Sequence, residues 1–549
     1  MELNLPEIHE AIAAAVPGRD CIVHRGRTWS WAQVTDDTRR FAAHLAAAGI
    51  GRHRTLDDCE PWESPHDHVA LYLHNGAEYL EAMLGTMKAG AAAVNINYRY
   101  VADELAHVLN DAAATAVVYH EAFTPTLEAV LPAVRTLRLL VRVPDGSGHP
   151  PLPGSIDWAD ALTGADPSMV DGLVQSWSGD DLYLLYTGGT TGAPKGVCWR
   201  QADFLVAALG IRSKDGSELD SLEPLVERAR GSSLRALPAP PFMHGAAHWN
   251  AISAWTSGGT VVIQDRTDHF DAADLLEVCE RERATSVLIV GDPFARPIVD
   301  ELRHRPRELP DLAFVMTGGA ALTARLANEL LEVLPHVTIL DVLGSSESGR
   351  QGTRATRSGS TTSGFEPSQG SVVLSHDKRR LLSPGEPEMG WLAQSGRTPR
   401  GYLGDPAKTV DTFPVVEGVR YAVPGDRARR RADGTIELHG RDAVTINTGG
   451  EKVFAEEVEA ALKTHPDVVD AIVVGRPSPR WGQEVVAVVA LRSDAATSDD
   501  ELRDACADHL ARYKLPKAFV RRDEVRRSPA GKPDYAWARA QFDEGAISP

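Results

Sequence analysis

The sequence predicts an α/β protein built on parallel strands, with a second, smaller α+β domain at its C-terminal end. Apolar strands alternate with helix-length amphipathic segments along 69–120 and again along 259–347. This rhythm implies parallel strands joined by helical crossovers. After Asp426 the pattern changes to a turn, a short helix and two long apolar strands. The 549 residues have room for both parts, because a domain takes roughly 100–200 residues.

The expected elements are separated by glycine and polar turns. The large part begins with a short strand pair and an amphipathic helix from Trp31 to Ala48. Further strands are expected at 69–76, 91–97, 114–120, 259–264, 285–293, 312–320 and 337–347, with helices at 78–90, 101–112, 272–283, 294–304 and 323–334. Two polar stretches, 213–233 and 350–378, are expected to be mobile loops.

The small domain is expected to follow a boundary between 441 and 442, which divides the chain into 1–441 and 442–549. A turn and strand at 434–441 lead into it. Its expected elements are helices at 455–463 and 499–511 and strands at 468–475 and 484–491.

Composition and charge exclude several classes of protein. The formal net charge of -19 argues against a nucleic-acid binder, because such binding depends on neutralising phosphates with cationic side chains. The five cysteines are scattered without a C-x-x-C pair, which indicates a reducing compartment and neither a disulfide framework nor a zinc cluster. The first residues do not resemble a signal peptide, and no apolar run reaches the roughly 18 residues of a membrane helix. We therefore predict a cytoplasmic protein with no integral membrane segment and no nucleic-acid partner.

The most informative stretch runs from Leu182 to Arg200, where two apolar segments flank a loop of glycines, threonines and a lysine. Glycines let backbone amides approach an anion, hydroxyls donate to phosphate oxygens, and Lys195 adds positive charge. A Walker loop is excluded because Pro194 precedes the lysine, Gly196 follows it, and the next residues have a strand pattern. The stretch therefore predicts a phosphate loop that closes a β-hairpin.

Three strands of the second parallel series end in glycine or polar turns, at 291–293, 318–320 and 344–347. Open parallel sheets bind ligands at the carboxyl ends of their strands. The three turns together predict one shared site, although each of them alone could be only a tight turn.

Eight motifs in order give the chain a family resemblance. They are YTGGTTGAPKGV (186–197), PPFMHG (240–245), GGA (318–320), GSSE (344–347), GYLGDPAKT (401–409), YAVPGD (421–426), GRDAVTINTGGEKVFAEEVE (440–459) and SPAGKPDY (528–535). Over nearly its whole length the chain resembles the adenylate-forming superfamily of acyl-CoA synthetases, firefly luciferases and peptide-synthetase adenylation domains. Within it, 97–105, 243–249 and 445–459 are most similar to actinobacterial fatty-acid and steroid-side-chain CoA ligases. The resemblance implies a β-barrel-like part in the large domain and a mobile C-terminal domain.

The resemblance also implies a reaction in two halves. A carboxylate attacks the α-phosphate of ATP to give an acyl-adenylate and pyrophosphate, and the thiol of CoA then displaces AMP. Because a carboxylate approaching a polyanion is repelled, the phosphate charge must be neutralised. The implied cofactors and co-substrates are therefore ATP, Mg²⁺ and CoA.

The residues implied for the nucleotide follow from the same motifs. Glu347 and Thr187 would hold Mg²⁺, for which hard oxygen ligands are suitable. Asp426 would accept the ribose hydroxyls, with Arg441 at the ribose or phosphate. The segments implied along the phosphates and the adenine comprise Thr187, Gly188, Gly189, Thr190, Thr191, Gly192, Lys195, Gly318, Gly319, Ala320, Gly344, Ser345 and Ser346. Leu343 stands where relatives carry an aromatic residue, so adenine would stack on an aliphatic face.

Lys532 resembles the lysine that enters the site during adenylation and stabilises the developing charge. Because it belongs to the small domain, it must leave when that domain rotates for thioester formation. Relatives usually have a polar hinge residue where this chain has Ala443. After the rotation, Gly449, Gly450 and Lys452 would face the pantetheine channel.

His244 resembles the residue that lines or gates the acyl pocket. Its spacing from His248 could mean a helical metal pair, but no third ligand is apparent. Met243 and His244 offer no anion for the ammonium group of an amino acid, so amino-acid substrates are disfavoured. An apolar cavity is expected between Trp249, Val290, Gly291 and Met316, with small residues at 245–247 that would admit a bulky acyl group.

We therefore predict an AMP-forming acyl-CoA ligase for an apolar carboxylic acid, either a fatty acid or a bulky acid such as a steroid side chain. Its predicted catalytic residues are Lys532, Glu347, Thr187 and His244. An enzyme that loads the phosphopantetheine of an acyl carrier protein is the nearest alternative. An inactive nucleotide-binding relative also stays open, because of Leu343 and Ala443. A homodimer is a further open possibility.

Overall fold

Two sheets of parallel strands form the body of the large N-terminal domain. The computed structural model describes residues 2–187, 194–359, 364–441, 444–448, 451–478, 481–493, 495–510, 512–529 and 531–542. The larger sheet has the order β16-β15-β14-β13-β12-β10-β11-β1-β2 and is parallel from β14 to β1. Its strands are β1 (Asp20–His24), β2 (Arg27–Ser30), β10 (Arg235–Pro238), β11 (Thr260–Ile263), β12 (Ser286–Ile289), β13 (Phe314–Gly318), β14 (Thr338–Ser345), β15 (Gly349–Thr356) and β16 (Glu366–Pro367).

The second parallel sheet has the order β4-β3-β5-β6-β7. It is built from β3 (His68–Tyr72), β4 (Ala92–Asn95), β5 (Ala114–His120), β6 (Leu139–Val143) and β7 (Ile156–Asp157). Parallel strands such as β3, β11 and β12 are short, fully buried runs, as parallel strands need when both faces are covered. The helices of the large domain are α1 (Leu5–Ala15), α2 (Trp31–Ala47), α3 (Ala77–Lys88), α4 (Ala102–Asp111), α5 (Thr124–Val130), α6 (Trp158–Thr163), α7 (Asp171–Val174), α8 (Gln201–Ala207), α9 (Glu223–Arg230), α10 (Gly245–Thr256), α11 (Ala272–Arg281), α12 (Gly291–His304), α13 (Ala324–Val333) and α14 (Pro406–Thr412).

Antiparallel strands complete the large domain. The hairpin β8 (Leu182–Thr187) and β9 (Lys195–Arg200) is extended by β19 (Gly401–Tyr402). The barrel-like part expected from the resemblance corresponds to an antiparallel sheet in the order β20-β21-β18-β22-β23, with β17 paired to β18. Its strands are β17 (Ser371–Leu374), β18 (Gly390–Ser395), β20 (Val415–Val416), β21 (Val419–Ala422), β22 (Asp426–Arg430) and β23 (Ile436–Arg441).

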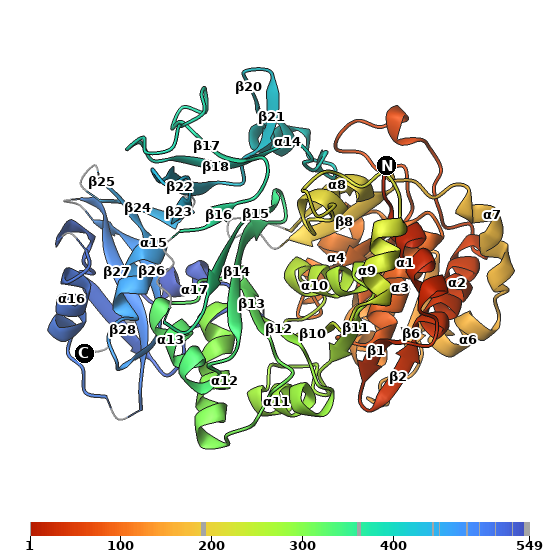
Figure 1. Cartoon of the computed structure of the whole chain (residues 1–549), viewed down its shortest axis with the longest axis horizontal. Coiled ribbons are helices and arrows are strands. Elements are labelled where there is room, and N and C mark those ends of the chain that lie inside the picture. The colour runs from red at the N-terminus through yellow and green to blue at the C-terminus, as the bar shows by residue number, and fades with distance from the viewer. Residues whose placement is uncertain are drawn as a thin grey trace.

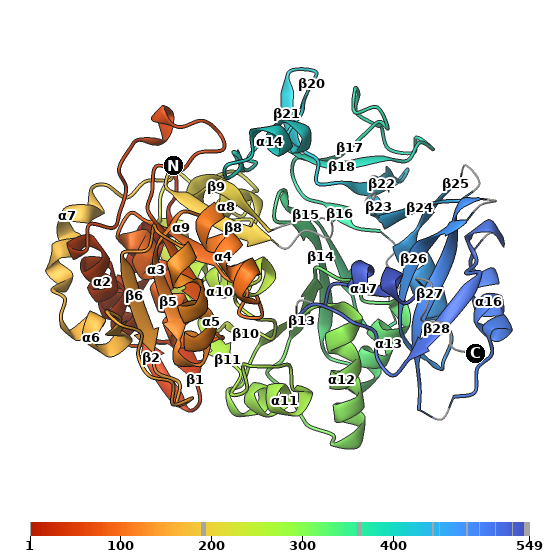
Figure 2. The ribbon, with the colours of Figure 1, turned by 180° about the vertical axis from the view of Figure 1, so that it is seen from behind.

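The small C-terminal domain is an α+β unit. Its sheet has the order β25-β24-β27-β26, with β28 paired to β27. The elements are β24 (Thr445–Thr448), β25 (Glu451–Phe454), α15 (Ala455–Leu462), β26 (Val468–Ser478), β27 (Gly482–Leu491), α16 (Asp499–Ala507), β28 (Ala518–Arg522) and α17 (Tyr535–Ala540). Figure 1 shows this domain in blue beside α12 and α13 of the large domain, and Figure 2 shows the same arrangement from behind. The predicted fold class is confirmed.

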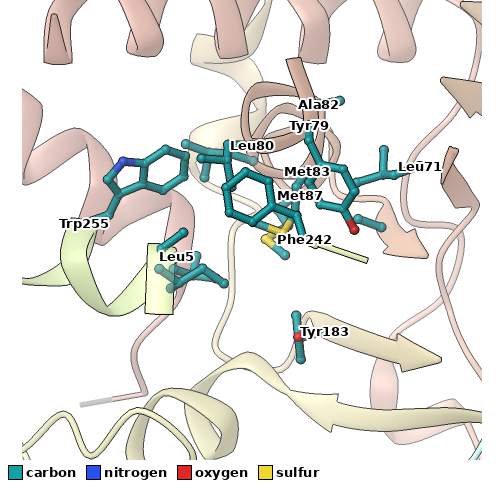
Figure 3. Close-up of a cluster of buried hydrophobic side chains, with 14 of the residues drawn as sticks. Leu5, Leu71, Tyr79, Leu80, Ala82, Met83, Met87, Tyr183, Phe242 and Trp255 are labelled. Atoms are coloured by element: carbon teal, nitrogen blue, oxygen red, sulfur yellow. The ribbon is translucent and has the colours of Figure 1, made fainter. Parts of the chain in front are cut away.

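The main apolar core joins the two parallel sheets, because it contains buried residues of α2, α3 and α10 together with residues of β1 and β3. Figure 3 shows a part of it, in which Phe242 lies beside Tyr79. The ring centroids of Tyr79 and Phe242 are 5.5 Å apart. Since Phe242 directly precedes Met243 and His244, this packing fixes the backbone that carries His244.

Two loop predictions are wrong. The stretch 213–233 contains α9, whose Leu225, Val226 and Ala229 are buried. The stretch 350–378 contains most of β15 together with β16 and β17, and β15 pairs with β14 along nearly its whole length. Helix α9 was missed because its buried face has only a few apolar residues among polar neighbours. Strand β15 was missed because backbone pairing holds it to β14, and such pairing needs little alternation of apolar and polar residues.

Two further findings concern the described residues alone. None of their helices combines the length and the apolar character needed to cross a bilayer. All five cysteines are buried free thiols.

Candidate active site

The hairpin predicted around the phosphate loop is present. Tyr186 pairs with Gly196 and Thr187 with Lys195 in the antiparallel β8–β9 ladder, so the strands end on either side of the loop. The loop itself, with Gly188, Gly189, Thr190, Thr191 and Gly192, lies outside the described residues. The Lys195 ammonium donates to Asp405, whose side chain also accepts from the Lys408 amide at the start of α14. Lys195 is the main cause of the lowered pKa of Asp405.

Asn95, at the end of β4, clamps the edge of this hairpin. Its side-chain amide donates to the Tyr186 carbonyl at 2.8 Å and to the Met243 carbonyl at 2.6 Å. Its oxygen accepts from the Tyr186 amide at 2.8 Å. The residues after these two partners are Thr187 and His244, so one buried side chain fixes the approach of both predicted site residues.

The carboxyl ends of β12, β13 and β14 lie next to each other, as predicted from their glycine turns. The Gly291 amide donates to the Thr317 hydroxyl at 3.0 Å. A Cβ on Gly291 would lie 2.4 Å from the Ala321 carbonyl oxygen, so only glycine fits there. Gly319 is exposed with φ of +81°. Between Gly318 and Ala320 the edge therefore presents bare backbone, which a flat ring can approach.

Glu347 lies in the turn after β14 and is held by the hairpin strands. The Tyr402 hydroxyl of β19 donates to its carboxylate at 2.9 Å. The Trp199 indole of β9 donates to the Ser346 carbonyl at 2.8 Å. These two contacts join the 344–347 turn, with Gly344 and Ser345, to β9, which flanks the phosphate loop, and to β19, which pairs with β9. A half-buried carboxylate with one oxygen already oriented fits the demands of a Mg²⁺ ligand.

Leu343 is 8% exposed and packs in an apolar cluster with Phe365 and Leu392. Little of its surface is available to a nucleotide ring. The sequence motif, from which we expected Leu343 to offer an aliphatic face to adenine, gave no sign of this packing.

Asp426 and Arg441 face each other across β22 and β23, where they are paired in the antiparallel register. Asp426 is 8% exposed. The side chain of Arg441 is outside the described part, as are Ala443, Gly449 and Gly450. Lys452 is placed by its backbone alone, opposite Asn447 in the β24–β25 hairpin.

His244 occupies the N-cap position of α10 without a side-chain capping bond, and Lys532 of the small domain lies within electrostatic range of it. Burial is the main cause that lowers the pKa of His244 to about 3, and the positive charge of Lys532 is the next. The imidazole is therefore neutral at physiological pH, and its Nε2 has no hydrogen-bond partner among the described residues. Gly531 lies against the large domain, where an added Cβ would be 3.2 Å from Val290 Cγ1.

His248 is not free to bind a metal with His244. Its Nε2 is hydrogen-bonded to the Tyr183 hydroxyl, and its Nδ1 to the Phe242 carbonyl at 2.7 Å. Within the described ranges, no group of three potential metal ligands is formed by His, Cys, Asp and Glu side chains.

Some residues expected to line the acyl pocket are already in contact with other side chains. The Trp249 indole donates to the Tyr183 hydroxyl at 2.7 Å. A Cβ on Gly245 would lie 3.0 Å from Leu185. The side-chain amide of Asn250, the residue after Trp249, lies 3.5 Å from the Met316 sulfur.

Comparison with known families decides the identity of the fold. The AMP-binding enzyme family matches residues 9–403, and the AMP-binding enzyme C-terminal domain matches residues 457–532. The chain belongs to the AMP-binding enzyme family. The medium-chain acyl-CoA ligase Mig of Mycobacterium avium is 46% identical over 99% of this chain and 98% of its own. The 3-oxocholest-4-en-26-oate–CoA ligase of Rhodococcus rhodochrous is 36% identical over 98% of this chain and 96% of its own.

Solved structures share the fold of this AMP-binding enzyme at low sequence identity. The anthranilate CoA ligase AuaEII in complex with anthranoyl-AMP has a TM-score of 0.78 at 21% identity, covering 97% of this chain and 96% of its own. ATP-bound MatB from Rhodopseudomonas palustris has a TM-score of 0.77 at 21% identity, covering 99% of this chain and 100% of its own. The predictions of an adenylate-forming fold and of an AMP-forming acyl-CoA synthetase are confirmed at the level of the family.

Proposed function

We propose that this AMP-binding enzyme is an acyl-CoA ligase that activates an apolar carboxylic acid with ATP and transfers the acyl group to CoA. The observation that carries the proposal is that the loop of Lys532 packs at the carboxyl end of β12, where a Cβ on Gly531 would lie 3.2 Å from Val290 Cγ1. The loop that carries Lys532 in one domain therefore lies against the strand-end site of the other domain. This arrangement suits a reaction in which negative charge develops on a phosphate.

For the nucleotide, we propose that the loop from Thr187 to Lys195 binds the β- and γ-phosphates. Asp426 and Arg441 would bind the ribose. Gly318, Gly319 and Ala320 would lie along the adenine. Glu347 and Thr187 would hold Mg²⁺, which when bound supplies positive charge to the phosphates. Tyr402 orients Glu347 for this role through its hydroxyl. Gly344, Ser345 and Ser346 would complete the wall beside the α-phosphate.

During adenylation, Lys532 stabilises the charge on the phosphate under attack by the carboxylate. His244 stays neutral, because burial and the neighbouring Lys532 lower its pKa to about 3. A neutral imidazole adds no competing charge at the point where the carboxylate must approach. For the second half-reaction, we propose that the domain after residue 441 rotates about the 442–443 segment and brings Gly449, Gly450 and Lys452 to the pantetheine of CoA.

For the substrate, we propose a medium- or long-chain fatty acid or a bulky polycyclic acid. The relatives named above act on a medium-chain acid and on a steroid carboxylate. The residues proposed to surround the acid are Trp249, Val290, Gly291 and Met316, none of which carries a charge. An acyl carrier protein in place of CoA, a homodimer and a cytoplasmic location stay predictions.

The decisive experiment is a panel of fatty, aryl and steroid carboxylates with ATP and Mg²⁺, scored by pyrophosphate release, followed by addition of CoA. We expect acid-dependent pyrophosphate release and an acyl-CoA product. AMP release without an acyl-CoA would favour the carrier-protein alternative. No acid-dependent pyrophosphate release from any acid would favour an inactive relative.

A further inference from the structure

Four charged side chains of alternating sign run from the large domain to the loop that carries Lys532. They are Asp292, Lys463, Asp470 and Arg527, here called the interdomain ion chain. The Lys463 ammonium lies 3.4 Å from the Asp292 carboxylate and 3.2 Å from the Asp470 carboxylate. Arg527 donates two hydrogen bonds to Asp470, at 2.6 and 2.8 Å. Only the contact between Asp292 and Lys463 crosses between the domains.

The ion chain ends at the backbone next to Lys532. Arg527 also donates to the Gly531 carbonyl at 3.0 Å, which is the carbonyl of the peptide bond to Lys532. The Lys532 amide donates to the Ser528 hydroxyl at 3.2 Å, and the Ser528 amide to the Lys532 carbonyl at 2.8 Å. The main chain of this loop is therefore held on both sides of Lys532.

Both ends of the ion chain return to one segment of the large domain. Asp292 stands in the first turn of α12, and Gly531 packs against Val290, two residues earlier. Figure 2 shows the start of α12 facing the small domain. The Asp292–Lys463 contact and the packing of Gly531 against Val290 therefore depend on the same relative position of the two domains.

The interdomain contact can open without leaving a bare buried charge. Lys463 keeps Asp470 within its own domain. Asp292 keeps the Thr323 amide at 2.8 Å and the Thr323 hydroxyl at 3.2 Å within the large domain. Removing the only partner of a buried charge is strongly unfavourable, whereas separating charges that each retain a partner is much less so. The 3.4 Å contact therefore has the properties of a reversible latch and not of a permanent interface.

We propose that Asp292 and Lys463 latch the two domains in the adenylating arrangement, and that Asp470 and Arg527 transmit this arrangement to the loop of Lys532. All four are positioning residues. The inference rests on the proposed function, because it assigns the present arrangement to the first half-reaction. The Arg325 guanidinium of the large domain supports the same docking, because it donates to the His465 carbonyl at 3.0 Å and to the Val468 carbonyl at 3.3 Å.

The test uses D292N in the full-length enzyme. The amide of asparagine keeps an acceptor for Thr323 but removes the negative charge that attracts Lys463. We expect acid-dependent ATP–pyrophosphate exchange to fall by about tenfold, since a shift of this size in the latched population needs ~1.4 kcal/mol. Thioester formation from a synthetic acyl-adenylate and CoA should keep its rate or rise. R527Q should give the same split between the half-reactions.

The matched control is K514M, which removes the 2.6 Å lysine–carboxylate pair between Lys514 and Glu457 inside the small domain. It should leave both half-reactions unchanged. Hydrogen–deuterium exchange of the 526–535 segment gives a readout that needs no catalysis, and it should become faster in D292N and not in K514M. Equal exchange of this segment in D292N and wild type, or an equal fall of both half-reactions, would overturn the latch. A wild-type enzyme without acid-dependent pyrophosphate release would overturn the proposed function, while the exchange of 526–535 would still decide the latch.

Discussion

Substitution of Asn95 tests directly how the site is assembled. The side chain is 7% exposed and makes three hydrogen bonds to the backbone of Tyr186 and Met243. Strand β8 is the edge of its three-stranded sheet, so Asn95 occupies the place of a neighbouring strand. Substitution N95A removes all three bonds and leaves the two Tyr186 groups and the Met243 carbonyl without this partner.

The expected loss follows from the hydrogen bonds. A typical intramolecular hydrogen bond contributes about 1 kcal/mol net, and a buried group left unsatisfied costs about 1–3 kcal/mol. Three bonds therefore predict a loss of about 3 kcal/mol or more in the free energy of unfolding. Because Thr187 and His244 follow the two clamped residues, we also expect kcat/KM for adenylation to fall by at least about tenfold, the equivalent of ~1.4 kcal/mol in the barrier.

The assays are thermal unfolding and acid-dependent pyrophosphate release. Substitution N110A is the matched control, because Asn110 also donates to two backbone carbonyls, of Ala106 and Ala133, but in an exposed position. Its effect on unfolding should stay within about 1 kcal/mol, with unchanged activity. If N95A unfolded at the same temperature as N110A and retained wild-type kcat/KM, the clamp would have no role in assembling the site.

Three further predictions concern the proposed chemistry and the buried histidines. Substitution K532A should lower ATP–pyrophosphate exchange by at least about a hundredfold, as expected for loss of a charge-stabilising group, and leave thioester formation from acyl-adenylate intact; equal exchange in both proteins would assign the role elsewhere. Substitution Y402F removes the hydrogen bond to Glu347, so a Mg²⁺ titration of pyrophosphate release should show a rate about tenfold lower and a higher Mg²⁺ requirement; an unchanged titration would separate Tyr402 from the metal. Burial lowers the pKa of both His120 and His244 to about 3, so the unfolded chain, with a histidine pKa of about 6.5, binds more protons between these values. Their contribution to stability is therefore complete above about pH 6.5 and is lost as the pH falls towards 3, by up to ~1.4 kcal/mol per histidine and pH unit; thermal unfolding at pH 7 and pH 5 should show the lower midpoint at pH 5, and equal midpoints would contradict the neutral state of these histidines.

The parts of the site that could be predicted are those written in short segments of sequence. The β8–β9 hairpin follows from two apolar runs around a glycine loop, and the neighbouring ends of β12, β13 and β14 follow from regular βα alternation. Asp426 and Arg441 lie opposite each other in the strand register, whereas in the sequence only a family resemblance connected them.

The parts that could not be predicted depend on contacts between distant segments. Asn95 is separated from Met243 by 148 positions, and in the sequence it is only one of two asparagines in the otherwise apolar run 91–97. Lys463 and Asp292 are 171 positions apart. Periodicity reports which face of a helix is buried, and it carries no information about which charge on another domain will lie opposite. Helix α9 was hidden for a related reason, since three buried residues are few among polar neighbours.

The pairing of Lys195 with Asp405 has a consequence for how the nucleotide loop discriminates among anions. The ammonium group has a resident counter-ion, so an entering anion must displace a carboxylate that is also fixed by the Lys408 amide. A fatty acid has a single carboxylate, which would form with Lys195 only the same kind of ion pair that Asp405 already forms. A triphosphate brings several charges and can also bond to the amides of the loop. We therefore expect the acid substrate to compete poorly for the place of the pyrophosphate, so that high acid concentrations should not inhibit pyrophosphate release.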